Sequence, residues 1–253
     1  TNINRILKEV GRDFPERVAA VIRKDYDKPI VISLVSSQMD ADRMDYLLRD
    51  AYFTGVNYGT FDLDRILRVL RPHQGRIVVK ESGMHAVEDY LMSRYQMYWQ
   101  VYFHPVTRSS EIVLRQIFRR ADELYRSGYA FGFMLPQLKH LFEGTMTVES
   151  YLSLDESMVQ AAFGQWIGER DELLADLCSR FLHRRLYKYI SQDALDEALI
   201  ERIRKEWARI GLHPGYHLEV DTPVDLPYDV YKPGAALDAS EKPPIMLLDN
   251  KDR

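Results

Sequence analysis

One segment, residues 36–55, constrains the fold most strongly, because it interleaves charged and apolar side chains at helical spacing. It reads SSQMDADRMDYLLRDAYFTG and contains Asp40, a residue type favoured at the N-cap of a helix. It closes with Gly55, which suits the position that follows a helix C-terminus. These two signals predict a helix over residues 41–54.

Three polar side chains of this predicted helix fall on one stripe. Asp42, Tyr46 and Asp50 are spaced four apart, and residues four apart lie one above the other on a helix. The same segment carries Leu47 and Leu48, so another face of the helix should be buried. Most charged helical faces are simply solvated. The spacing alone leaves open whether this stripe is a functional site or a solvated face.

A second stripe lies on a long helix that the sequence predicts over residues 84–104, with Pro105 ending it. Arg94, Tyr98 and Tyr102 are again four residues apart. An arginine guanidinium suits phosphate oxygens, and tyrosine rings suit a sugar or a base. The alternative is a well-packed amphipathic helix whose tyrosines reach the edge of the core.

Helical patterning dominates the first part of the chain. Residues 1–25 predict two short amphipathic helices, and FDLDRILRVLRP predicts a helix stopped by Pro72. The only strand expected in this part is RIVVK, residues 76–80, after a turn. A further helix should end at Gly128.

The character of the sequence changes near residue 128, where glycine, proline and aromatic residues mix. We therefore predict two domains, residues 1–128 and residues 129–253. Helices return in the segments DESMVQAAFGQW, ERDELLADLCSRFLHRRLYKYI and DALDEALIERIRKEWARIG. From His213 onward, apolar and polar residues alternate between prolines, as strands and turns do. The expected fold is mainly α, with a smaller α+β region at the C-terminal end.

Composition narrows the function. The net charge of −4 gives no general attraction to polyanions, so any nucleotide site must be local. The single cysteine, Cys178, excludes an intrachain disulfide and a cysteine zinc cluster and suits a reducing compartment. No apolar run reaches the roughly 18 residues of a membrane span. We expect a cytoplasmic protein that does not enter membranes.

Residues 25–125 resemble the second half of the HD-domain dNTP triphosphohydrolases, of the bacterial kind related to the vertebrate SAM-and-HD-domain dNTPase. The resemblance rests on the motif D-x-D-R-x-D-Y-x-x-R-D at residues 40–50 and on the two segments that follow it, FDLDRILRVLRP and RIVVKESGMHAVEDYLMSRYQMYWQVYFHPV. It implies the C-terminal half of a helical HD domain. In that family a histidine, a His-Asp dipeptide and a later aspartate hold a divalent metal such as Mg or Mn, and Asp42 matches the later aspartate.

The resemblance also implies roles in substrate binding. Arg43 matches a basic residue near the substrate phosphates, where the vertebrate enzyme has lysine. Tyr46 and Asp50 match residues that hold the deoxyribose, and the carboxylate accepts a hydrogen bond from the 3′-hydroxyl. Arg94 matches a phosphate-binding arginine.

Further roles follow for four more positions. Tyr98 stands where the vertebrate relative has histidine. Tyr102 matches a tyrosine that packs on the sugar and excludes a 2′-hydroxyl by its size. Arg65 and Lys80 resemble positions that contact the phosphates of an activating nucleotide between subunits, and such proteins resemble homotetramers.

One departure from the family is large. None of the seven histidines is followed by aspartate, so this chain offers one of the four expected metal ligands. One carboxylate does not hold a catalytic divalent ion. We expect the chain to be part of a longer protein and to be inactive by itself. For the whole protein, the resemblance implies metal-assisted hydrolysis of a dNTP to a deoxynucleoside and triphosphate.

Three alternatives stay open. The protein could be another HD phosphohydrolase, acting on an alarmone or a cyclic nucleotide. It could be a non-catalytic nucleotide-binding or assembly module, with residues 84–104 at an interface enriched in Tyr, Trp and Arg. It could bind single-stranded nucleic acid through arginine and interleaved aromatics, although the net charge of −4 argues against that.

Overall fold

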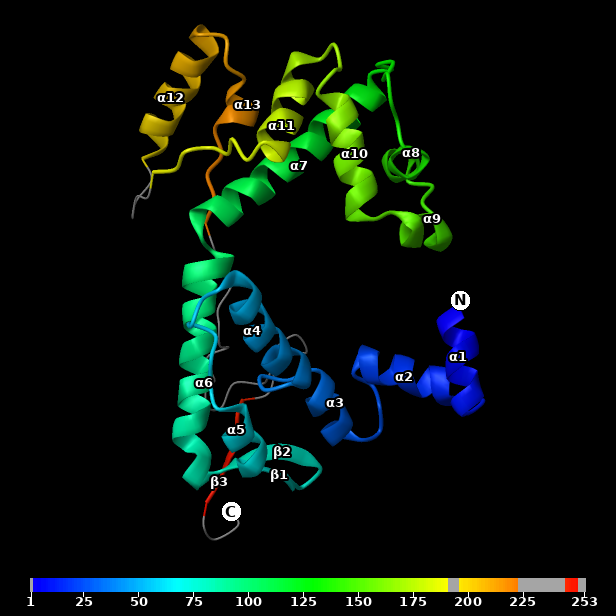
Figure 1. The fold of residues 1–253 in the computed structure, drawn as a ribbon, viewed down its shortest axis with the longest axis vertical. Helices are drawn as coiled ribbons and strands as arrows, with labels where there is room; N and C mark the ends of the chain where they lie inside the picture. The colour runs from blue at the N-terminus through cyan, green and yellow to red at the C-terminus, as the bar shows by residue number, and fades with distance from the viewer. Residues whose placement is uncertain (1, 191–195, 223–243, 250–253) are drawn as a thin grey trace. The chain divides into compact units, whose positions relative to one another are not determined.

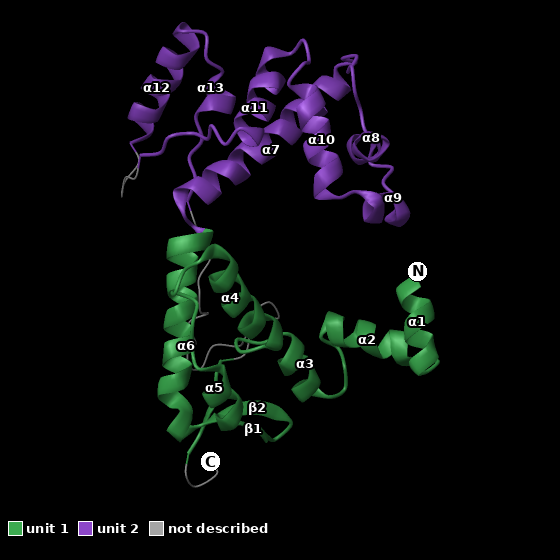
Figure 2. Cartoon of the chain, in the orientation of Figure 1, with its two compact units in different colours: residues 1–102, 224–253 green, residues 103–223 purple. Residues whose placement is uncertain are grey.

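The computed structural model describes residues 2–190, 196–222 and 244–249, which form mostly helices and one small sheet (Figure 1). The fold is mainly α, as the sequence predicts. The chain divides into two compact units, which we call unit 1 (residues 1–102 with 224–253) and unit 2 (residues 103–223) (Figure 2). The change in composition near residue 128 lies inside unit 2.

Unit 1 consists of short helices around a core. Its helices are α1 (Asn2–Val10), α2 (Phe14–Arg23), α3 (Pro29–Val35), α4 (Ala41–Thr54), α5 (Leu63–Val69), the 3₁₀ helix η1 (Glu81–Gly83), α6 (Met84–Met97) and the π-helix η2 (Tyr98–Tyr102). The first two are the short helices predicted within residues 1–25, and Pro15 lies in the first turn of α2, where its missing N–H costs no hydrogen bond. Leu47, Tyr90 and Met97 are fully buried, and they pack α4 against α6.

Helix α4 confirms the prediction made from its end signals. The side chain of Asp40 accepts a hydrogen bond from the backbone N–H of Arg43 at 2.8 Å, which satisfies a donor that the first helical turn leaves open. Gly55 follows Thr54 with φ at 72°, in the left-handed region that glycine adopts at low cost. The sequence therefore fixes both ends of the helix that carries the first stripe.

The sheet corrects one prediction. Strands β1 (Leu70–His73) and β2 (Arg76–Lys80) are antiparallel, and β3 (Leu247–Leu248) pairs with β2 in parallel. We expected Pro72 to stop a helix and residues 76–80 to be the only strand of this part. Instead α5 ends at Val69 and Pro72 lies within β1, opposite Ile77. Since β1 is an edge strand of the sheet, the missing N–H of proline is tolerated there.

The predicted helix over residues 84–104 is also corrected. The α-helix ends at Met97, and residues Tyr98–Tyr102 continue it as a π-helix. Pro105 begins the next helix, α7 (Pro105–Arg126), because proline suits the first helical turn, where its missing N–H has no partner to lose. The ring of His104 caps that helix by accepting from the backbone N–H of Val106 at 3.3 Å.

Unit 2 is built on α7, whose C-terminal end is followed by Gly128 with φ at 79°. Its other helices are α8 (Pro136–Glu143), α9 (Val148–Ser153), α10 (Glu156–Trp166), α11 (Glu172–Leu182), α12 (Glu197–Arg209) and α13 (Pro214–His217). Helices α7, α10 and α11 supply much of its core, in which Trp166 is fully buried.

The C-terminal part agrees with the sequence-based expectation at β3 and departs from it at residues 183–190 and 214–222. Helix α11 ends at Leu182, earlier than its apolar pattern predicts. Residues 218–222 contain no strand, and residues 214–217 form the short helix α13. The remaining strands expected within residues 223–243 lie outside the described residues.

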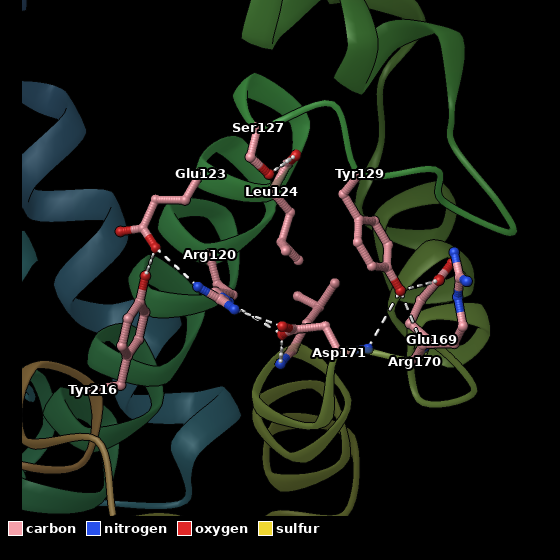
Figure 3. A network of polar contacts seen from close by, with 10 residues as sticks. Arg120, Glu123, Leu124, Ser127, Tyr129, Glu169, Arg170, Asp171 and Tyr216 are labelled. Atoms are coloured by element: carbon pink, nitrogen blue, oxygen red, sulfur yellow. Dashed lines mark hydrogen bonds and ion pairs between the residues drawn. The ribbon is translucent and has the colours of Figure 1, made fainter. Parts of the chain in front are cut away.

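A network of polar contacts stabilises unit 2 (Figure 3). Arg120 of α7 pairs with Asp171 at the start of α11, with Nη2 and Oδ2 2.5 Å apart. The hydroxyl of Tyr129 donates to Glu169 at 3.0 Å and accepts from the backbone N–H of Arg170 at 3.1 Å. The side chains of Arg120, Asp171 and Tyr129 thus have their polar partners within unit 2. These contacts fix the start of α11.

None of the helices in the described ranges is both long enough and apolar enough to cross a membrane.

Candidate functional site

The two predicted stripes face each other within unit 1. The hydroxyl of Tyr102, on η2, donates a hydrogen bond to Oδ2 of Asp50, on α4, at 2.8 Å. The rings of Tyr46 and Tyr102 meet edge to face, with their centroids 6.4 Å apart. The rings of Tyr98 and Tyr102 also meet edge to face, at 5.3 Å. Side chains 52 residues apart in sequence therefore form one cluster.

The environment keeps two of the phenols of this cluster protonated. Burial raises the pKa of Tyr46, and the neighbouring Tyr98 raises it further. Burial also raises the pKa of Tyr102, and its hydrogen bond to Asp50 adds to that shift. A phenol with a raised pKa stays neutral at physiological pH and can donate its proton in a hydrogen bond. The cluster therefore presents neutral hydroxyl groups beside the carboxylate of Asp50.

Arg94 is the charged centre of the second stripe, and it is buried, with only 4% of the residue exposed. Its Nη1 donates to the side-chain oxygen of Gln38 at 3.4 Å, and its guanidinium lies 5.5 Å from the ring centre of Tyr98. Both partners are neutral. Within the described part of the chain, Arg94 forms no ion pair and its Nε has no hydrogen-bond partner. A buried cation without a counter-charge is suited to binding an anion.

Burial by itself lowers the pKa of Arg94, but its hydrogen bond with Tyr98 and the nearby phenols outweigh this effect, so the pKa is raised. The guanidinium therefore keeps its charge at every physiological pH.

Arg43 has a different environment. Its Nη1 pairs with the carboxylate of Asp40 and donates to the backbone carbonyl of Ser37 at 2.6 Å. Asp40 is 2% exposed, so this ion pair is almost entirely shielded from water. The positive charge of Arg43 is therefore compensated within the protein, in contrast to that of Arg94.

Asp42, the predicted metal ligand, lies on the exposed side of the first turn of α4. Its side chain makes no hydrogen bond or ion pair with any described residue. The described residues contain no group of three or more His, Cys, Asp or Glu side chains that could hold a metal ion. A divalent ion needs several such ligands, so the residues described here do not by themselves form a metal centre.

The two remaining predicted residues lie on other elements of unit 1. Arg65 is on α5 and donates to the backbone carbonyl of Ser82 at 3.0 Å. Lys80 ends β2. Both are exposed, so an anionic ligand could reach them.

Two residues of the cluster were missed by sequence reasoning. Gln38 is 2% exposed, and its backbone carbonyl accepts from the hydroxyl of Tyr90 at 2.9 Å. Tyr90 lies four residues before Arg94, so extending the second stripe backward would have found it. Gln38 precedes the N-cap of α4 and belongs to neither stripe, so no spacing pattern points to it.

Comparison with known proteins adds family information to this geometry. Residues 61–127 match the family model described as the HD associated region. A solved structure of a phosphohydrolase from Bacteroides thetaiotaomicron superposes with a TM-score of 0.74 at 26% identity, covering 85% of this chain and 57% of that one. These matches support a relationship with HD-domain phosphohydrolases.

The HD associated region spans the segment from α5 to α7, so it includes the second stripe, while the first stripe precedes it. Among curated proteins, YwfO of Bacillus subtilis (strain 168) is 51% identical over 249 residues. That match covers 98% of this chain and 57% of YwfO, so the chain spans little more than half the length of this relative. The deoxynucleoside triphosphate triphosphohydrolase SAMHD1 of Gallus gallus is 21% identical over 173 residues, which cover 66% of this chain and 27% of that protein.

Proposed function

We propose that this chain is part of a metal-dependent HD phosphohydrolase that converts a deoxynucleoside triphosphate to a deoxynucleoside and triphosphate. One observation carries the proposal: a buried, uncompensated arginine lies in the same cluster as a carboxylate and three phenols. The arginine is suited to a phosphate, and the carboxylate and phenols are suited to a sugar. The Gallus gallus relative, named as a deoxynucleoside triphosphate triphosphohydrolase, supports this choice of substrate.

Each residue of the cluster has a task in this proposal. Arg94 binds an oxygen of the triphosphate and stabilises the negative charge that grows on the leaving group. Asp50 accepts a hydrogen bond from the 3′-hydroxyl of the sugar. Tyr46 packs on the deoxyribose, and Tyr98 holds Arg94 in place. Tyr102 fills the space beside the 2′ carbon, so a ribonucleotide is rejected by size.

Arg43 and Asp42 complete the proposed site. Arg43 lies one turn before Tyr46 on α4 and contributes positive potential near the phosphates, although Asp40 compensates much of its charge. Asp42 supplies one ligand to a divalent metal such as Mg or Mn. The resemblance also requires a histidine and a His-Asp pair, and none of the seven histidines of this sequence is followed by aspartate.

Regulation is a further part of the proposal. Arg65 and Lys80 are exposed and basic, as contacts with the phosphates of an activating nucleotide require. We place that nucleotide between the subunits of a homotetramer.

The proposal is tested by comparing Arg94→Ala with Tyr102→Ala in the full-length protein. Arg94→Ala removes a contact that strengthens as charge builds on the leaving group, so kcat should fall more than the affinity for dGTP. Tyr102→Ala opens space beside the 2′ carbon, so the preference for dGTP over GTP should weaken. The measurements are hydrolysis of both nucleotides and thermal melts on the same samples. If each variant loses hydrolysis of dGTP and GTP equally, in step with a lowered Tm, the second stripe has only a packing role.

A further inference from the structure

We infer that Gln38 is a positioning residue that holds Arg94 without neutralising it, and so directs the substrate's phosphate to Arg94 rather than to Arg43. The inference deepens the proposed function and rests on it. It comes from the segment 37–40, between α3 and α4, which contacts both arginines of the cluster but with partners of different charge.

Gln38 is firmly placed. It is 2% exposed, and its backbone carbonyl accepts from the hydroxyl of Tyr90 at 2.9 Å. Tyr90 is fully buried and lies one turn before Arg94 on α6. Tyr90 of α6 therefore fixes the backbone of Gln38. The side-chain oxygen of Gln38 in turn accepts from Nη1 of Arg94, one turn further along α6, at 3.4 Å.

The chemistry of the two partners differs in one respect that matters for anion binding. Asp40 gives Arg43 a full negative charge in a buried ion pair. Gln38 gives Arg94 a neutral amide, which orients the guanidinium through a hydrogen bond but leaves its charge uncompensated. Both arginines are shielded from water, so the uncompensated one gains more from an incoming anion.

This division predicts what a carboxylate at position 38 would do. Gln38→Glu keeps the size of the side chain and adds one negative charge beside Arg94. The new ion pair would compete with the phosphate, while the folded protein would gain a favourable charge pair. Anion affinity and stability should therefore change in opposite directions, which a residue that only packs would not produce.

The test is binding of inorganic tripolyphosphate to the full-length protein by titration calorimetry, with thermal melts on the same samples. The panel is wild type, Arg94→Ala, Gln38→Glu, Gln38→Met and Gln96→Glu. Gln38→Met is neutral and of similar size, so it removes the orienting hydrogen bond to Arg94 without adding a charge. Gln96→Glu makes the same chemical change on an exposed position of α6 and controls for added charge.

We expect Gln38→Glu to lose about tenfold or more in affinity with an unchanged or raised Tm, since hydrogen bonds to charged groups contribute that much. Gln38→Met should lose several-fold, and Gln96→Glu should bind as wild type. If Arg94→Ala fails to bind while Gln38→Glu binds as tightly as wild type, the role of Gln38 is wrong and the anion site stands.

Three further outcomes would contradict the inference. If Gln38→Glu and Gln38→Met weaken tripolyphosphate binding equally, each with a lowered Tm, then Gln38 is only a packing residue. If Gln38→Glu and Gln96→Glu weaken tripolyphosphate binding equally, the effect of Gln38→Glu is general charge repulsion. If wild type and Arg94→Ala bind alike, or neither binds, the anion site of the proposed function fails and the inference fails with it.

Discussion

The hydroxyl and the ring of Tyr102 have separable roles. The hydroxyl joins the two stripes through Asp50, whereas the ring meets Tyr46 and Tyr98 edge to face. In the proposed site the ring excludes ribonucleotides and the hydroxyl fixes the orientation of the ring. These roles can be measured one at a time.

Tyr102→Phe keeps the ring and removes the hydrogen bond to Asp50. We expect the free energy of unfolding to fall by about 1.5–3 kcal/mol, the net contribution of a hydrogen bond to a charged group. The preference for dGTP over GTP should remain close to that of wild type, because the ring still fills the space. Chemical denaturation and paired hydrolysis assays measure the two effects. A Phe variant as permissive for GTP as Tyr102→Ala would refute exclusion by the ring.

Asp42 offers a second residue-scale test, because it is exposed and makes no hydrogen bond or ion pair with a described residue. Asp42→Ala should leave the free energy of unfolding unchanged within about 0.5 kcal/mol, as for most surface positions. Hydrolysis by the full-length protein should be abolished, because the proposed site would lose a metal ligand. Asp45→Ala is the matched control, since Asp45 is an exposed aspartate on the same helix. Near-normal turnover by Asp42→Ala in metal-replete buffer would remove Asp42 from the metal site.

At this scale, the fixed spacing pointed to most of the clustered side chains, but Tyr90, on the same spacing, and Gln38, on none, were missed. The four-residue period predicted two stripes. The structure brings Tyr46, Asp50 and Tyr102 of these stripes into one cluster, because α4 packs against α6 and η2. The period did not find Gln38, whose position depends on how the end of one helix meets another.

At the scale of elements, two helices of unit 1 begin with the same cap in different surroundings. Asp40 at α4 and Asp62 at α5 each accept from the backbone N–H three residues later at 2.8 Å. Asp62 is exposed, whereas Asp40 is buried and also pairs with Arg43. The pair of caps separates the contribution of capping from that of the buried charge.

Asp62→Ala should lower the free energy of unfolding by about 1 kcal/mol, as the loss of a cap does. Asp40→Ala should cost about 3–5 kcal/mol, because it also leaves the buried charge of Arg43 without its partner. Denaturant unfolding of both variants gives the comparison. Similar losses in the two variants would show that the buried ion pair adds nothing beyond the cap.

Elements whose ends carry local signals were predicted well, and α4 is the best example. The π-helix η2 and strand β1 were not predicted, because neither has a local signal of its own. A π-helix keeps the same apolar and aromatic pattern as the α-helix it continues. Strand β1 depends on pairing with β2 and overrides the helical pattern of LDRILRVLRP.

At the scale of the whole molecule, each unit has its own core, and the candidate site belongs to unit 1. Unit 2 is stabilised in part by the contact between Arg120 and Asp171 (Figure 3). Burial raises the pKa of Asp171, but hydrogen bonds from Arg120 and from the backbone N–H of Leu174 outweigh it, so the pKa lies below its ordinary value of 3.8. The folded state therefore favours the charged carboxylate.

A lowered pKa in the folded state means that the stabilisation is complete above the ordinary value and is lost as the pH falls through the folded value. We expect the stability of unit 2 to be level above about pH 5 and to fall below about pH 4. Asp171→Asn should cost about 1–3 kcal/mol at pH 7 and flatten the acid dependence. Hydrogen exchange of the α11 amides at several pH values measures this. The control is Asp122→Asn, which removes a partly exposed carboxylate that pairs with Arg126 on α7. An acid dependence that stays in Asp171→Asn, as it should in this control, would contradict the assignment.

The central claim concerns the reaction of the whole protein, and the products of dGTP test it most directly. The full-length protein, supplied with Mg or Mn, should release deoxyguanosine and inorganic triphosphate in equal amounts, and Arg94→Ala should release far less. Chromatographic separation of the nucleoside from its phosphates, with phosphorus NMR of the inorganic product, identifies both. Hydrolysis that yields pyrophosphate or single phosphates, turnover of only an alarmone or a cyclic nucleotide, or no turnover of any dNTP would contradict the account.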